Sequence, residues 1–254
     1  MTPLDAPPPT RRERQWEATY AEIVEVSRAL LAEEAELSLR AVASRMGMTA
    51  PALYRYVSSY QQLVDLVAFA IDRAAAELFA AAAGRQPDDD PAARLVAAAT
   101  EFRMWAHANP REFSLVFANP VAEPIGHRRD LVTVQSSCLL LTDMIFDIWQ
   151  QRRFPVPALE DLPAEVAASL LDPLIPADVG KVPVGDRGLV WVYMQGWTQL
   201  YGVVTLEVLG HMDPRVIASG EMFVDTVRRF APVLGLADEV GRLERIIRKR
   251  FARG

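Results

Sequence analysis

The chain has 254 residues, 51% of them hydrophobic, and a formal net charge of -6 at pH 7. This size and apolar content indicate a globular protein with a sizeable core. Negative charge spread evenly over the surface would repel a nucleic-acid backbone, so DNA binding would require a local group of donors. The single cysteine, Cys138, excludes an internal disulfide and favours a reducing, cytoplasmic location.

The first residues, MTPLDAPPPT, have neither the basic end nor the apolar run of a secretory signal, and their prolines oppose regular structure. We therefore expect a disordered arm over residues 1–14. Its last four residues, Arg-Arg-Glu-Arg, are either a solvated end or a flexible arm that contacts DNA. Charges interrupt the later apolar stretches, so no membrane span is expected.

Apolar residues then recur at spacings of three and four, with no long alternating β-branched stretch, which predicts an all-α fold. Prolines, glycines and capping residues divide this pattern into helices. The expected helices span residues 15–34, 38–46, 50–57, 60–83, 91–108, 110–118, 128–153, 163–171, 187–210, 214–234 and 238–252. Segments 119–127 and 172–186 are expected to be loops. The C-terminal tail, residues 240–254, carries five cations after position 244 and is expected either to pack on a dimer or to stay mobile.

Two short helices flank a glycine in residues 38–59. Ser38 is suited to cap the first helix, and Gly47 ends it. Thr49 is suited to cap the second helix, in whose first turn Pro51 is tolerated. Small and polar side chains then point outward at the start of this second helix. This is the layout of a helix-turn-helix motif, whose second helix can approach a DNA groove.

The run SLRAVASRMGMTAPALYRYVSSYQQLVDLV, residues 38–67, resembles the signature of the TetR/AcrR family of transcriptional regulators. The resemblance implies a helix-turn-helix DNA-binding domain over residues 15–59. It also implies a larger helical ligand-binding and dimerisation domain over residues 60–254. The expected partners are a double-stranded DNA operator with an inverted repeat, a small-molecule effector and a second copy of the chain.

The resemblance also implies which residues contact DNA. These are Arg40, Thr49, Ala50, Pro51, Tyr54, Arg55, Tyr56 and Tyr60. The alternative for Tyr54 and Tyr56 is that both are packing residues. Family members often have a lysine where this chain has Tyr60. A hydroxyl can bind a phosphate but releases no counterion, so we expect a shallow salt dependence of DNA binding.

The C-terminal half resembles the TetR subgroup whose C-terminal domain is named for a Trp-His-Gly motif. Trp197 and Gly202 are present, but Tyr201 stands in place of the histidine. The last two long helices carry apolar residues on more than one face, and in the family they form the dimer interface. The expected interface residues are Trp197, Tyr201, Val204, Val208 and Phe223.

Mixed apolar and polar faces on residues 91–108 and 128–153 predict a cavity for a mostly apolar or aromatic ligand. The candidate ligand-binding residues are Phe102, Trp105, Gln135, Cys138, Thr142 and Trp149. The alternative for each of them is ordinary core packing.

Enzyme motifs are missing from the sequence. His107, His127 and His211 are far apart, and neither a phosphate-binding glycine loop nor paired metal ligands occur. We therefore expect no enzymatic activity, metal or cofactor. The expected function is a ligand-responsive transcriptional regulator, a repressor released from its operator by the effector. The alternative is a helical small-molecule binding protein that has lost specific DNA binding.

Overall fold

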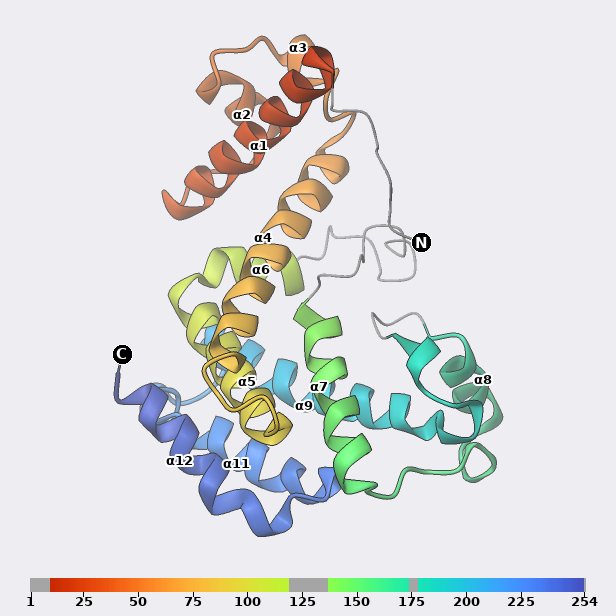
Figure 1. Cartoon of the computed structure of the whole chain (residues 1–254). Coiled ribbons are helices and arrows are strands. Elements are labelled where there is room, and N and C mark those ends of the chain that lie inside the picture. Colours follow the sequence, from red (N-terminus) through yellow and green to blue (C-terminus); the bar gives the residue numbers. More distant parts are fainter. Residues whose placement is uncertain (1–9, 119–136, 174–177, 254) are drawn as a thin grey trace. The chain divides into compact units, whose positions relative to one another are not determined.

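The computed structural model describes residues 10–118, 137–173 and 178–253 (Figure 1). Every regular element in these ranges is an α-helix or a 3-10 turn, and none is a strand, which confirms the all-α prediction. No helix in the described ranges is long and apolar enough to cross a membrane.

Contacts divide the chain into two compact units, residues 1–70 and 71–254. The first contains α1 (Arg11–Ala32), α2 (Leu39–Arg45), α3 (Ala50–Leu53) and the beginning of α4 (Tyr60–Ala83). The boundary therefore falls inside α4, ten or so residues beyond the expected end of the DNA-binding domain. The first turns of α4 carry fully buried apolar side chains that belong to the small unit: Leu63, Val64 and Val67.

Helix α1 begins at Arg11, which corrects the expected extent of the disordered arm. The Thr10 hydroxyl accepts a hydrogen bond from the Glu13 amide at 3.2 Å, and the Glu13 carboxylate accepts one from the Thr10 amide at 2.6 Å. This reciprocal capping box satisfies two amides that would otherwise lack partners at the start of the helix. Residues 11–14 are therefore helical, while residues 1–9 lie outside the described ranges.

The second unit contains the rest of α4 and eight further described helices. These are α5 (Pro91–Ala108), α6 (Pro110–Phe117), α7 (Ser137–Arg152), α8 (Ala164–Leu171), α9 (Gly188–Val208), α10 (Pro214–Ser219), α11 (Glu221–Phe230) and α12 (Val240–Phe251). The described 3-10 turns are η2 (Leu159–Asp161), η3 (Val179–Lys181), η4 (Val184–Asp186), η5 (Ala231–Leu234) and η6 (Ala237–Glu239). The part of the expected helix 128–153 before Ser137 lies outside the described ranges.

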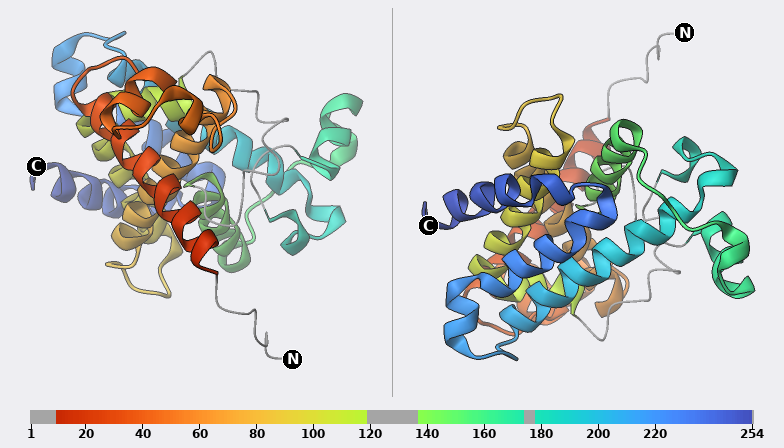
Figure 2. Two further views of the ribbon diagram at one scale, coloured as in Figure 1. Left: turned by 90° about the horizontal axis from the view of Figure 1, so that it is seen from above. Right: turned by 90° about the horizontal axis from the view of Figure 1, so that it is seen from below.

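Helix α5 is central to this unit and contacts α6, α7, α9 and α12. Twelve of its eighteen residues are buried, and many of these are alanines, which let neighbouring helices approach closely. Helices α9 and α11 run side by side (Figure 2), and α12 packs on α5 and α11 of its own chain.

The expected single helix over residues 214–234 is interrupted. Gly220 adopts a left-handed conformation with φ of 67°, which ends α10 and starts α11 in a new direction. A Cβ atom at this position would lie 2.5 Å from the ring of Phe251. Both the backbone angle and the contact with α12 therefore require glycine here. The helical pattern of the sequence continues through this point, so periodicity alone could not reveal the break.

Candidate nucleic-acid interface and ligand cavity

The turn between α2 and α3 has a well-defined structural cause. Gly47 adopts a φ of 66°, the Met48 amide donates to the Ala43 carbonyl at 2.8 Å, and the Gly47 amide donates to the Ser44 carbonyl at 3.2 Å. This is a Schellman motif, which satisfies carbonyls at the end of α2 and redirects the chain. Ser38 caps the start of α2 as expected, because its hydroxyl accepts from the Ala41 amide. The turn thus sets the direction in which the chain continues from α2 into α3.

The first residues of α3 form a small, accessible surface. Thr49 and Pro51 are exposed and Ala50 is half-buried, while Leu53 and Val57 point into the core. The Thr49 side chain does not cap α3, contrary to expectation. Its hydroxyl therefore remains available to an external acceptor or donor. Small side chains at this position allow the backbone to approach a ligand surface closely.

Exposed cationic and phenolic groups precede and follow α3 in the chain, with Arg40 in α2 and Tyr54 and Arg55 directly after α3. Arg40 and Arg55 are exposed, and within the described part of the chain neither has an ion-pair partner. Arg45 differs, because both of its terminal nitrogens donate to the Glu33 carboxylate at 2.9 and 2.6 Å. Tyr54 is 51% exposed. The guanidinium groups of Arg40 and Arg55 and the phenol of Tyr54 are therefore available to bind anionic or hydrogen-bonding groups of a partner.

Tyr56 has mainly a packing role. Its ring centroid lies 4.4 Å from that of Trp16 and 6.0 Å from that of Tyr20, and the Tyr20 hydroxyl donates to the Tyr56 carbonyl at 2.8 Å. These contacts agree with the packing alternative for the Tyr56 ring. Contact of Tyr56 with DNA stays a prediction. Trp16 and Tyr20, both in α1, pack against Tyr56, and the sequence analysis did not single them out. Their spacing of four residues on one helix face was the available signal.

Tyr60, the first residue of α4, is 40% exposed. Its position at a helix start and its exposure agree with the expected contact to a phosphate, which stays a prediction.

The second unit contains a partly open cavity of about 80 Å³ between α5, α7, α9, α11 and α12. A buried water needs roughly 10–15 Å³ on such a measure, so the space exceeds that of a single water several times. Among the described residues that line the cavity, none is charged. They include Leu95, Val96 and Ala99 of α5, Cys138, Leu141, Thr142 and Ile145 of α7, Tyr193, Gly196 and Trp197 of α9, Phe223, Val227 and Phe230 of α11, and Leu243 of α12.

Five polar side chains border this space, those of Cys138, Thr142, Tyr193, Gln199 and Thr226. The Thr142 hydroxyl already donates to the Leu139 carbonyl at 2.9 Å. Burial, reinforced by the charge of Asp72, raises the pKa of Cys138 to about 12. Burial also raises the pKa of Tyr193, with a further contribution from nearby carboxylates such as Asp143. Both groups are therefore neutral at physiological pH, and the cavity is uncharged.

The expected ligand-binding residues have different locations. Cys138 and Thr142 line the cavity. Phe102 and Trp105 instead belong to a buried aromatic cluster with Phe79 and Phe113, and Trp149 packs beneath the Arg153 guanidinium at 4.4 Å. None of these three lines the cavity, so ordinary core packing describes them. Gln135 lies outside the described residues.

Helices α9 and α11 supply cavity walls that the sequence analysis did not identify. A Cβ atom at Gly196 would lie 2.9 Å from the Phe230 ring, so glycine is needed for these helices to meet here. An isolated glycine inside a strongly helical pattern was the signal that could have indicated this close contact.

Comparison with known sequences places this architecture in a family. The family described as Tetracyclin repressor-like, C-terminal domain, matches residues 95–230, which are more than half of the chain and contain most of the cavity walls. The chain belongs to the TetR family. This agrees with the resemblance of residues 38–67 and with the helical architecture of both units.

Curated relatives of this TetR-family chain include the HTH-type transcriptional regulators Mb1846 of Mycobacterium bovis and Rv1816 of Mycobacterium tuberculosis. Each is 36% identical over 115 residues, which are 41% of this chain and 46% of the relative. The match thus spans less than half the length of these relatives. The crystal structure of the regulatory protein SCO4313 superposes with a TM-score of 0.57 at 24% identity, covering 89% of this chain and all of that one. This second likeness establishes the shared fold.

Two of the five expected dimer residues of this TetR-family chain require correction. Val204 and Phe223 have no exposed surface within a single chain, so neither can contact a second copy. Trp197 lines the cavity, and Tyr201 donates from its hydroxyl to the Phe117 carbonyl at 2.7 Å. Val208 is half-buried. Val204 and Phe223 thus face inward, whereas dimer contacts of Trp197, Tyr201 and Val208, which are half-buried, stay predictions.

A different face of the same two helices is exposed. On α9 it carries Leu206 and Leu209, and on α11 it carries Met222, each more than 40% exposed. Thr198 and Gly202 continue this face along α9 at spacings of four residues.

Proposed function

We propose that the protein is a DNA-binding transcriptional regulator that binds its operator through the surface around α3. The observation that carries the proposal is the pair of exposed arginines, Arg40 and Arg55, without ion-pair partners among the described residues. Arg40 lies in α2, and Arg55 follows the end of α3. Guanidinium groups bind phosphates and can pair with guanine in the major groove. The names of the curated relatives, HTH-type transcriptional regulators, support the same activity.

We further propose a homodimer built on the exposed face of α9 and α11. Contiguous exposed apolar side chains such as Leu206, Leu209 and Met222 are typical of an interaction surface. A Cβ atom at Gly202 would meet nothing within 4 Å, so this part of α9 is open to close approach by another helix. A two-fold dimer would recognise an inverted repeat with half-sites about 34 Å apart, or a multiple of this distance.

The cavity supports a small, uncharged apolar or aromatic effector. A charged ligand in the cavity would lose its hydration and would find no opposite charge among the described lining residues, so its binding would carry a large desolvation cost. A neutral ring or short aliphatic chain would instead replace empty space with dispersion contacts. We propose that the effector favours a conformation with reduced operator affinity, which makes the protein a repressor. The extent of release is limited by the difference in effector affinity between the two conformations.

The first experiment is selection of bound duplexes from a random DNA pool at near-physiological salt, followed by sequencing. We expect enrichment of an inverted repeat. Arg55→Ala should then weaken operator binding roughly 5-fold to 150-fold if Arg55 contacts a base. Arg215→Ala is the matched control, because Arg215 is an exposed arginine of α10 in the other unit.

Failure to enrich any sequence, from protein shown to be folded, would contradict the proposal. Weak retention on all duplexes, abolished by moderate salt, would instead support a helical small-molecule binding protein without specific DNA binding.

A further inference from the structure

The cavity is most exposed where α9 and α11 border it. Among the described lining residues, Gln199 of α9 keeps the largest exposed fraction, and Thr226 of α11 is half-exposed. The described lining residues from η5 and α12 are buried, and α5 and α7 each supply one half-exposed lining residue. We call Gln199 and Thr226 the cavity rim.

The rim on α9 is continuous with the exposed apolar face proposed for the dimer. Gln199 precedes Leu206 by seven residues, which is about two helical turns, so both side chains lie on the same side of α9. Gly202 lies between them, and a Cβ atom there would meet nothing within 4 Å. The open face of α9 therefore extends from Leu206 past Gly202 to the cavity rim.

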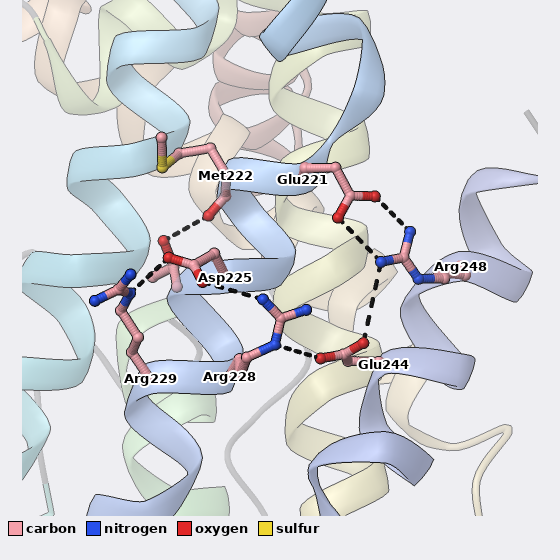
Figure 3. Close-up of polar contacts among 8 residues, drawn as sticks. Glu221, Met222, Asp225, Arg228, Arg229, Glu244 and Arg248 are labelled. Carbon is pink, nitrogen blue, oxygen red and sulfur yellow. Dashed lines mark hydrogen bonds and ion pairs between the residues drawn. The ribbon is translucent and has the colours of Figure 1, made fainter.

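On α11 the rim adjoins the same face. Met222, which is 42% exposed, precedes Thr226 by about one turn, and the Thr226 hydroxyl donates to the Met222 carbonyl at 2.8 Å. Another side of α11 is held to α12 by ion pairs (Figure 3), in which Arg228 donates to the Glu244 carboxylate at 2.7 Å. These ion pairs leave the side of α11 that carries Met222 and Thr226 exposed.

A second helix packed on this face would cover the rim. Gln199 is three residues from Gly202, or about 4.5 Å along the helix axis, whereas a helix with its side chains is about 10 Å wide. A helix in contact with Gly202 therefore also lies over Gln199. The α9 helix of a second copy is such a helix, because a two-fold dimer pairs the same surface of both chains.

Without this cover, the cavity is incomplete as a ligand site. Small-molecule sites bury about 70–90% of the ligand surface. A neutral apolar ligand in the cavity of a single chain would keep part of its surface in water at the rim, which lowers its affinity. A second copy over the rim would remove that surface from water. The dimer would therefore bind the ligand more tightly than a single chain.

We propose that the cavity opens into the dimer interface, so that α9 of a second copy completes the effector site. Effector binding and dimerisation then strengthen each other by the same factor, because the two equilibria are linked. This inference rests on the proposed dimer and effector cavity, and it adds that the two are coupled.

Accessibility of the rim tests where the second copy lies. Gln199→Cys, made in a Cys138→Ala background, has its one thiol at the rim. A sulfonated maleimide should label it roughly tenfold more slowly in the dimer than in a monomer that also carries Leu206→Glu, because burial hinders the thiol. The added glutamate would repel this anionic reagent, so faster labelling of the monomer cannot result from charge. Ser169→Cys, at an exposed position of α8, is the control and should be labelled equally in both.

Affinity for a neutral probe tests the coupling. Fluorobenzene, followed by fluorine NMR, should bind Leu206→Glu roughly tenfold more weakly than the parent dimer, which corresponds to about 55 Å² of apolar surface left in water. Leu171→Glu is the matched control, because Leu171 is similarly exposed but lies in α8. In the parent protein, saturating fluorobenzene should lower the dimer dissociation constant roughly tenfold for each occupied cavity, as sedimentation velocity would measure.

The outcomes distinguish this inference from the proposed function. Equal labelling of Gln199→Cys in dimer and monomer, or equal affinity of both for fluorobenzene, would overturn the inference and leave the dimer and its cavity in place. A Leu206→Glu protein that stays dimeric would place the interface elsewhere and overturn both. If Leu206→Glu does not fold, the parent protein decides, because a dissociation constant unchanged by fluorobenzene would overturn the coupling.

Discussion

The hydroxyl of Tyr201 in α9 donates a hydrogen bond to the main-chain carbonyl of Phe117 at 2.7 Å. This carbonyl is at the last residue of α6, where no amide of the helix can reach it. The Tyr201 ring also stacks on Trp197 with an interplanar angle of 10°. Tyr201, which stands in place of the histidine of the Trp-His-Gly motif, therefore provides a donor for the last carbonyl of α6. Its ring packs against Trp197, which lines the cavity.

Tyr201→Phe should lower the free energy of unfolding by about 1 kcal/mol, because the Phe117 carbonyl loses its donor while the ring stack remains. Urea denaturation followed by circular dichroism measures the change. Tyr54→Phe removes a hydroxyl from an exposed tyrosine and serves as the control. Equal stability of Tyr201→Phe and the parent protein would contradict a structural role for the hydrogen bond.

A buried ion pair links α5 to α9. The Arg103 side chain donates to the fully buried Glu207 carboxylate at 2.6 Å and to the Ile217 carbonyl at 2.9 Å. His107 lies 2.8 Å from the same carboxylate oxygen, and the other Glu207 oxygen has no partner among the described residues. Arg103→Met should therefore destabilise the protein by about 3–5 kcal/mol, since it leaves a buried carboxylate without its main partner.

Urea unfolding again provides the measurement. The double variant Arg103→Met with Glu207→Leu should recover much of the loss, because it removes both charges rather than one. No recovery in the double variant would show that packing, not charge compensation, accounts for the effect.

Tyr60→Lys should strengthen DNA binding and make it more sensitive to salt. Tyr60 is exposed at the start of α4, where a lysine could neutralise one phosphate and release its counterions. The slope of log K against log salt concentration should become steeper by about 0.9 for each DNA-bound subunit. Titrations at several salt concentrations measure it. An unchanged slope would mean that this position does not contact the backbone.

Leu206→Glu should shift the protein from dimer to monomer. The substitution places a charge in the exposed apolar face of α9, where association would bury it without a partner. Sedimentation velocity gives the oligomeric state. Leu171→Glu is the matched control, because Leu171 is equally exposed but lies in α8. Dimers that persist in Leu206→Glu would place the interface elsewhere.

Asp72→Asn should stabilise the protein at neutral pH. Burial raises the pKa of Asp72 above its ordinary value, despite a hydrogen bond from the Ser137 hydroxyl at 2.5 Å. Because the folded state then binds its proton more tightly than the unfolded state, stability is lost as pH rises from about 4 through the raised pKa. An asparagine keeps the acceptor for Ser137 and removes this loss. Urea unfolding from pH 4 to 7.5 should show a flatter profile, and an identical profile would contradict the assignment.

Much of the fold was predictable, because helix periodicity and breakers are local properties of the chain. The expected helices 60–83 and 91–108 match α4 and α5 at both ends. The interruption at Gly220 was not predictable from periodicity, since the apolar spacing continues through the left-handed glycine that ends α10. The start of α1 was missed for a local reason, because the Thr10–Glu13 capping box was not recognised.

The two candidate sites also differ in how much of each could be predicted from the sequence. The reading surface is built from residues 38–60, close in sequence, and its turn chemistry is visible in Ser38, Gly47 and Pro51. The cavity is assembled from five helices, and among its expected residues that the structure describes, only Cys138 and Thr142 line it.

By itself, the sequence determined that this is an all-helical TetR-family chain with a glycine-terminated helix-turn-helix, because such features depend on spacings within a few turns. Tertiary structure alone decided which of several apolar stripes on α9 and α11 faces inward. Val204 and Phe223 are buried while Leu206 and Met222 are exposed. Side chains of equal hydrophobicity on one helix differ only in what packs against them, and that depends on helices far away in the chain.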